Sequence, residues 1–247
     1  RFFTISILFI LPFNVFSQQE KQEGHINTNK LRQLYDEFST PNMFRTASGS
    51  PGSAYYQQKA DYKINIELDD KNQKIYGDET VTYTNNSPET LSYIWLQLDQ
   101  NVRKKDSPSL DIDSNGVRPA YIPDSFDKDF LKNPFDGGFN IDYVLDGNRK
   151  PLSHFVNQTM MRINLPLPLK TGEKFSFSIK WWFNIPDHVK ENSRSGYEYF
   201  PGDGNSTFSI AQFFPRMAVY NEVEGWQNYQ FWEMESLLFH LEIMMLK

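Results

Sequence analysis

Apolar and polar residues alternate with a period of two in several separate segments of the chain. The clearest segment is 175–183, where every second residue is large and apolar: Phe175, Phe177, Ile179, Trp181 and Phe183. Successive side chains of a β-strand point to opposite faces, so this alternation is typical of a strand with one buried face. Similar alternation runs through residues 61–69, 75–85, 139–145 and 161–169, and turn-forming sequences separate these segments. The sequence therefore predicts an antiparallel all-β domain.

Three further segments refine this prediction. Residues 91–98 are apolar in both phases at their centre, which favours an inner strand covered on both faces. Pro166 and Pro168 lie within 161–169, and proline cannot donate a ladder hydrogen bond, so this strand is expected at an edge. Residues 101–138 are rich in Asp, Pro and Gly without a clear period, and we expect a long surface excursion there.

The chain begins with a short apolar run. Arg1 precedes the almost wholly apolar residues 2–16, and a polar stretch follows Ser17. This arrangement is typical of a secretory signal peptide, and the run is shorter than the roughly 20 residues of a membrane-spanning helix. We therefore expect residues 1–17 to be a signal peptide with an incomplete start. The mature protein is expected to begin near Gln18, to be exported to the periplasm or the extracellular space, and to have no membrane contact after cleavage. The alternative is a buried N-terminal strand.

Residues 18–54 are expected to form a leader and linker. Apolar residues recur at helical spacing and predict one short helix that ends before Pro41; they are Leu31, Leu34, Tyr35 and Phe38. The Ser, Gly and Pro residues of 48–53 indicate a linker. The β domain is expected over residues 55–232.

Composition excludes several functional classes. Hydrophobic residues make up 39% of the chain and aromatic residues 16%, which is enough for a substantial core. The net charge of −6 comes from interspersed acidic and basic residues without a basic patch, so no nucleic-acid partner is expected. The chain has no cysteine, which excludes disulfides, thiolate metal sites and a cysteine nucleophile.

Motifs for catalysis or metal binding are missing. The zincin motif HExxH is absent, and no histidine has a second one at the next helical turn; the four are His25, His154, His188 and His240. A site that joins His154 and His188 with a carboxylate in space is an alternative. Residues 111–116 (DIDSNG) resemble the start of a calcium loop, but Ile122 occupies the position of its bidentate glutamate. We expect no catalytic residue, metal ligand or cofactor in this chain.

Three stretches of the chain form a familiar set. They are residues 61–86 with 91–101 (LSYIWLQLDQN), residues 165–186 (LPLPLKTGEKFSFSIKWWFNIP) and residues 208–226 (FSIAQFFPRMAVYNEVEGW). In this order and spacing they resemble the N-terminal domain of the aminopeptidase N family of zinc metallopeptidases, in its bacterial, secreted branch. The resemblance covers about residues 55–231.

The resemblance implies a saddle-shaped β domain that packs beside a thermolysin-like catalytic domain. That catalytic domain, with its zinc, its HExxH motif and its peptide substrate, lies outside this chain, so these are expected as cofactor and partners of the full-length parent. The family's N-terminal domain contributes a glutamine to the substrate groove, and Gln212 matches it. Its usual acidic or amide companion is Phe214 here, so a second role for Gln212 is equally open, in which it pairs with backbone at a domain seam.

The last residues break the pattern of the domain. After Trp232 the spacing becomes helical and three methionines crowd together, with an apolar stripe of Met234, Leu237, Leu238, Leu241 and Met245. One base added after the Trp232 codon allows the tail to encode GNGEFAFSFGNYDVK, a glycine turn followed by an alternating strand. We therefore interpret residues 233–247 as an out-of-frame tail. The alternative is a genuine C-terminal helix.

These observations predict the non-catalytic N-terminal domain of an exported zinc-dependent aminopeptidase, inactive without its catalytic domain. Two other functions fit the same strands. One is a stand-alone β-sandwich that binds or adheres through exposed aromatic residues. The other is a catalytically dead scaffold that keeps the fold.

Overall fold

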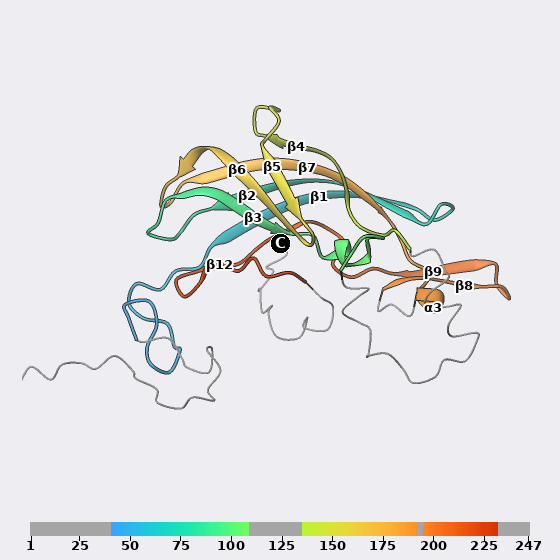
Figure 1. Cartoon of the computed structure of the whole chain (residues 1–247), viewed down its shortest axis with the longest axis horizontal. Coiled ribbons are helices and arrows are strands. Elements are labelled where there is room, and N and C mark those ends of the chain that lie inside the picture. The colour runs from blue at the N-terminus through green and yellow to red at the C-terminus, as the bar shows by residue number, and fades with distance from the viewer. Residues whose placement is uncertain (1–40, 109–134, 192–194, 232–247) are drawn as a thin grey trace, which may run out of the picture.

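A computed structural model of the chain describes residues 41–108, 135–191 and 195–231. The described part is all-β and antiparallel, as the sequence predicts, with very little helix (Figure 1). The first four-stranded sheet has the order β1 (Lys59–Asp69), β2 (Lys74–Thr84), β7 (Lys174–Asn184) and β4 (Asn140–Asp146). The second has the order β10 (Arg216–Met217), β3 (Leu91–Gln97), β6 (Met160–Leu169) and β5 (His154–Asn157).

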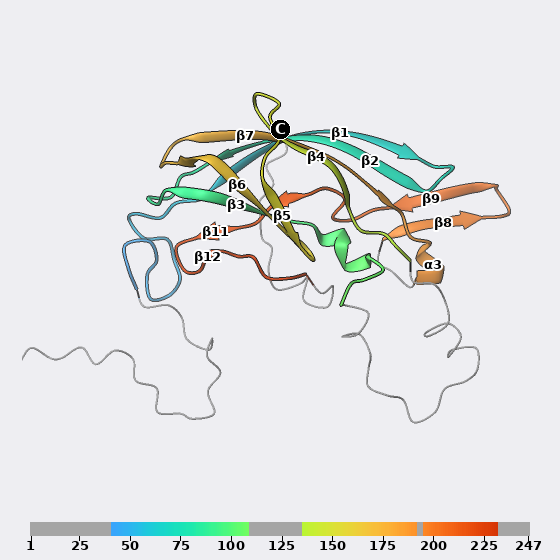
Figure 2. The ribbon, with the colours of Figure 1, turned by 45° about the horizontal axis from the view of Figure 1, so that its top comes forward.

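Short elements complete the described chain. β8 (Gly196–Phe200) and β9 (Asn205–Ser209) form one hairpin, and β11 (Tyr220–Asn221) and β12 (Gly225–Trp226) form another. A 3-10 helix, η1 (Asp99–Arg103), follows β3, and α3 (His188–Glu191) precedes β8. The β1–β2 hairpin turn and the β8–β9 hairpin project toward the same side of the molecule (Figures 1 and 2). No helix among the described residues is long and apolar enough to span a membrane.

One hydrophobic core contains side chains of both sheets. β2 and β7 pair along their whole length, and their inward positions are buried: Ile75, Val81, Tyr83, Phe177, Ile179, Trp181 and Phe183. The second sheet contributes Ile94, Leu96, Met161 and Ile163 to the same core. The predicted alternation is thus confirmed in β2 and β7, whose apolar phase faces inward. In β6 it holds for Met161 and Ile163, whereas Leu167 is 77% exposed.

Gly77 and Glu79 are the two inward positions of β2 that carry no apolar side chain. Gly77 pairs with Trp181, and a Cβ on Gly77 would lie 2.2 Å from the Trp181 ring, so only glycine leaves room for the indole. Glu79 is 0% exposed, and neither of its carboxyl oxygens has a hydrogen-bond partner among the described residues. Burial raises the pKa of Glu79 to about 9, and the nearby Asp78 carboxylate adds to the shift. This carboxyl group is therefore neutral in the folded protein at pH 7.

The refined strand predictions are met in part. β3 is an inner strand, between β10 and β6, but only one of its faces is fully buried, since Tyr93 and Trp95 on the other face are half-buried. β6 is not an edge strand over its first residues, where β5 pairs with it. Pro166 and Pro168 lie beyond the end of β5, so no ladder hydrogen bond from β5 is lost at the prolines.

The predicted surface excursion of residues 101–138 is wrong at its start. Asn101 and Val102 belong to η1 and are buried. Residues 109–134 lie outside the described residues, as do the predicted signal peptide, the leader helix, the calcium-like loop and the tail at 233–247.

Candidate functional site

The segment that carries Gln212 links β9 to β10 and lies against η1. The Gln100 side chain donates from Nε2 to the backbone oxygens of Ala211, at 2.7 Å, and of Gln212, at 3.3 Å. Gln100 is itself fully buried and is oriented by Arg103, whose Nη1 donates to Gln100 Oε1 at 3.1 Å. A buried amide bonded to two successive carbonyls fixes the path of the backbone at Gln212.

The polar residues of η1 connect several loops at this place. Asn101 donates from Nδ2 to the Gln158 oxygen at 2.6 Å and accepts from the Phe139 backbone N–H at 2.8 Å. These contacts join residues far apart in the sequence to one short helix. In the sequence, this cluster corresponds to the polar run that directly follows an apolar strand. The cluster was not predicted, because the residues from 101 onward were assigned to a surface excursion.

An ion pair anchors the other end of the segment. Arg216 Nη2 lies 2.8 Å from Asp99 Oδ2, and Asp99 is only 3% exposed. Burial raises the pKa of Asp99, and the Arg216 guanidinium opposes that shift without cancelling it. Arg216 therefore supplies the positive charge that compensates the buried Asp99 carboxylate.

Aromatic contacts attach the middle of the segment to the first sheet. Phe214 packs edge-on against Tyr62 of β1, with ring centroids 5.4 Å apart, and it also contacts Phe213. The Tyr62 hydroxyl accepts a 2.8 Å hydrogen bond from the Met217 backbone N–H. Phe214, which stands where an acidic or amide companion was expected, thus serves packing.

Gln212 itself has a left-handed backbone, with φ of 52°, and is half-buried. Among the described residues its side-chain amide has no hydrogen-bond partner. At this place it is the Gln100 side chain that pairs with backbone, and both roles expected of Gln212 remain predictions. The Gln212 amide keeps its two donors and its acceptor available.

Replacement of Gln212 with glycine is expected to leave the stability unchanged or to raise it by a few tenths of a kcal/mol, because glycine adopts a positive φ without a Cβ penalty. Replacement with valine is expected to cost about 1 kcal/mol or more, since a β-branched residue resists this conformation. Urea unfolding of the two variants and the parent chain measures the difference. A large loss for Gln212→Gly would show that the side chain holds the fold.

Metal-binding groups do not cluster in the part of the chain that the structure describes. No group of three or more His, Cys, Asp or Glu residues there is arranged to hold a metal ion. His154 Nδ1 lies 3.0 Å from the Leu152 backbone oxygen, and His188 begins α3. The proposed joint site of His154 and His188 is therefore not formed by these residues.

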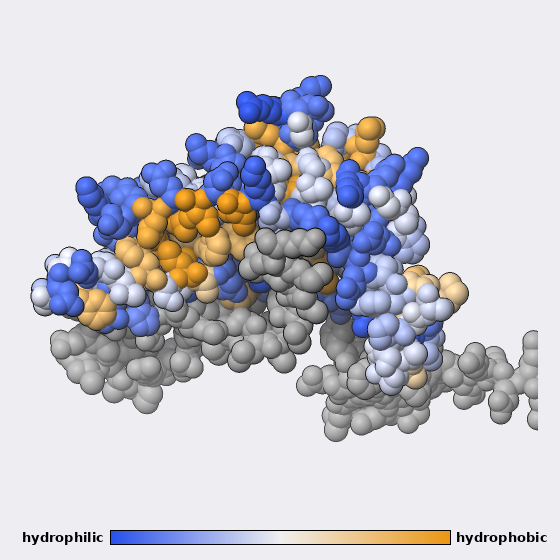
Figure 3. Space-filling view, turned by 180° about the vertical axis from the view of Figure 1, so that it is seen from behind, coloured by the Kyte–Doolittle hydropathy of each residue, from blue (hydrophilic) through white to orange (hydrophobic). Residues whose placement is uncertain are grey.

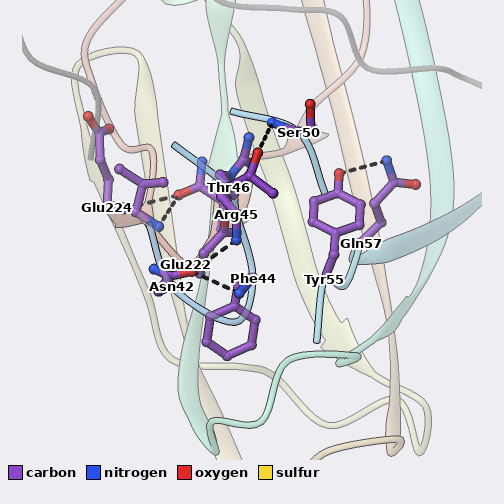
Figure 4. Close-up of polar contacts among 11 residues, drawn as sticks. Asn42, Phe44, Arg45, Thr46, Ser50, Tyr55, Gln57, Glu222 and Glu224 are labelled. Atoms are coloured by element: carbon purple, nitrogen blue, oxygen red, sulfur yellow. Dashed lines mark hydrogen bonds and ion pairs between the residues drawn. The ribbon is translucent and has the colours of Figure 1, made fainter. Parts of the chain in front are cut away.

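A second polar cluster ties residues 42–57 to the β11–β12 hairpin (Figure 4). Arg45 Nε donates to Glu222 Oε1, and Asn42 Oδ1 accepts from the backbone N–H groups of Phe44 and Arg45. Burial, followed by the Glu222 carboxylate, raises the pKa of Tyr56 to about 12. These contacts hold the chain that enters β1 against the end of the described chain, which is a structural role.

The chain is similar to known proteins in structure and not in sequence. No protein-family model matches the chain, and no curated protein sequence matches it. Solved structures that match include a two-domain M1 zinc metallopeptidase variant bound to L-tryptophan, with 14% identity and a TM-score of 0.33, over 56% of this chain and 23% of that chain. An M1 zinc metallopeptidase from Deinococcus radiodurans matches with 14% identity and a TM-score of 0.33, over 55% of this chain and 22% of that one. The chain thus covers about a quarter of these structures, and the likeness assigns no activity.

Proposed function

We propose that the chain is the non-catalytic N-terminal β domain of an exported zinc-dependent aminopeptidase. One observation carries the proposal. The three stretches that resemble this family, although far apart in the sequence, pack against one another: β7 of the second pairs with β2 of the first, and the Gln212 segment of the third contacts η1 of the first. The first supplies β1, β2, β3 and η1, the second supplies β7, and the third supplies the segment 208–226. Gln100 and Asp99 of the first stretch bind the backbone of residues 211–212 and the Arg216 side chain of the third.

In this proposal the domain presents Gln212 to the peptide bound in the groove of the catalytic domain. Gln100 fixes the backbone at Gln212 through two hydrogen bonds, while the side-chain amide of Gln212 lacks a partner among the described residues. An amide donates and accepts at once, so it suits both the carbonyl and the N–H of a peptide backbone. The partners are therefore the chain's own catalytic domain and, in the assembled parent, a peptide.

Zinc belongs to the catalytic domain in this proposal. The described residues offer no ligand set for it. When bound there, zinc would lower the pKa of its water and supply the nucleophile for peptide hydrolysis. The part of this chain is to complete and shape the groove, so the chain alone is expected to be inactive.

The encoding DNA tests the proposal. We expect the frame one base away, entered at the Trp232 codon, to encode GNGEFAFSFGNYDVK and then a peptidase domain with HExxH. The repaired gene product should hydrolyse aminoacyl reporter substrates in a chelator-sensitive way, and the chain of 247 residues should not. If the DNA continues in frame and no frame encodes HExxH, the proposal fails, and a stand-alone binding or adhesion module becomes the better interpretation.

A further inference from the structure

β1 is an edge strand of the first sheet, and its outer edge pairs with no strand among the described residues. All 11 residues of β1 pair with β2 without a register shift, and the strand contains no proline or glycine. The opposite edge strand, β4, has 7 residues and an irregular register between Ile141 and Tyr143. Edge strands are usually blunted by shortness, proline or bulges. β1 lacks these features and, although its outer face carries charged side chains, it presents a long, regular row of backbone donors and acceptors.

The same strand carries exposed apolar side chains on the face that elsewhere covers the core. Ile66 lies opposite Gly77 and Leu68 opposite Ile75, yet Ile66 is 47% exposed and Leu68 is 44% exposed. Viewed from behind, the half of the molecule with the β1–β2 and β8–β9 hairpins has an apolar patch next to a hydrophilic end (Figure 3). A regular edge beside an apolar strip is a site where another strand can gain both hydrogen bonds and buried area.

We infer that β1 binds β1 of a second copy of this chain, antiparallel about a two-fold axis at Asn65. This pairing places Ile64 opposite Ile66 of the second copy, and Tyr62 opposite its Leu68. The two apolar strips then form one continuous surface on the inner face of a sheet that runs through both copies. An isologous contact of this kind closes on itself and makes a dimer.

Charge selects this register. On the outer face, Lys63 of each copy lies opposite Glu67 of the other, which gives two ion pairs across the axis. Neither residue forms an ion pair with another described residue of its own chain. With the axis at Lys63 the two lysines would face each other, and with the axis at Ile64 Asp61 would face Glu67. An axis at Ile66 would pair Lys63 with Asp69, whose carboxylate already accepts hydrogen bonds from Lys71 and Asn72.

A charge swap tests the pairing in the full chain. Lys63→Glu and Glu67→Lys each place two like-charge pairs across the axis, and each is expected to raise the dimer dissociation constant about tenfold or more. The double variant Lys63→Glu/Glu67→Lys restores both pairs and should return to within about threefold of the parent chain. Sedimentation velocity over a range of concentrations measures the constants. Lys180→Glu, an exposed change of the same charge on the interior strand β7, is the control and should leave the dimer unchanged.

A second measurement uses the absence of cysteine from the chain. Only a residue on the axis meets its own copy, and directly opposed residues of antiparallel strands have Cα atoms about 4.5–5.5 Å apart, which suits a disulfide. Asn65→Cys is therefore expected to give a disulfide-linked dimer on mild oxidation. Asp61→Cys, on the same face but distant from its copy, should stay monomeric on a denaturing non-reducing gel.

Three results would overturn the inference. The first is a monomer at every concentration, which would leave the strip to a different occupant, such as the catalytic domain proposed above. The second is a dimer that ignores all β1 variants. The third is equal cross-linking of Asn65→Cys and Asp61→Cys. None of these depends on the downstream reading frame, so the dimer and the proposed function fail or stand separately.

Discussion

Replacing Glu79 with glutamine is expected to stabilise the domain at pH 7 by about 3 kcal/mol. The pKa of Glu79 is about 9 in the folded protein and 4.5 without the burial, so folding takes up a proton between these pH values. Stability that is fully present below pH 4.5 is therefore lost progressively as the pH rises toward 9. Glutamine is neutral at every pH and similar in size, so it removes this loss.

Urea unfolding of the parent chain and Glu79→Gln across pH 4 to 9 is the measurement. The two curves should meet near pH 4 and separate as the pH rises. Glu224→Gln, at an exposed glutamate of the β11–β12 turn, is the matched control and should track the parent chain. Parallel curves for the parent chain and Glu79→Gln would contradict the prediction and would mean that the carboxyl group has a buried partner.

Arg216→Met is expected to destabilise the domain by about 3–5 kcal/mol, because it leaves the Asp99 carboxylate buried without a compensating charge. Without the guanidinium the pKa of Asp99 rises further, because burial raises this pKa and the guanidinium is the group that lowers it. The loss should therefore shrink as the pH falls, because at low pH the Asp99 carboxyl group of the folded chain is neutral with or without the guanidinium.

The double variant Asp99→Asn/Arg216→Met is expected to recover most of this loss, since it removes the orphaned charge rather than one partner. A double-mutant cycle with urea unfolding at pH 7 and pH 4 separates the pair from each single effect. If Arg216→Met cost less than about 1 kcal/mol, the ion pair would behave like an exposed one. The anchor of the Gln212 segment would then lie elsewhere.

The long strands of the domain could be predicted because their patterns are local. In β7, five alternating apolar residues define both the strand and its buried face. β8, β9 and β10 were missed, since β10 has two residues and the β8–β9 hairpin is only half-buried, so neither produces a periodic apolar pattern. Pairing partners far apart in the chain leave no mark in a local pattern.

The candidate site shows the same limit. Gln212 could be named from the resemblance, but nothing in the sequence indicates that Gln100 fixes its backbone or that its φ is positive. The burial of Glu79 could have been predicted, because Glu79 lies in the same inward-facing phase of β2 as Val81 and Tyr83. A charged residue in a buried phase is the signal that would have found it.

The pairing of β2 with β7 also sets the order of events during folding. Thr80 and Ser178, which are hydrogen-bonded across these central strands, lie 98 residues apart. A chain that is synthesised from its N-terminus can form the β1–β2 hairpin early. The inner face of this hairpin stays uncovered until β7 has been synthesised and has paired with β2. Such non-local pairing folds slowly, on a scale of milliseconds to seconds in small β proteins. During that delay the nascent hairpin exposes Val81, Tyr83 and the strip of β1 together, and this interval is when chaperone binding would matter most.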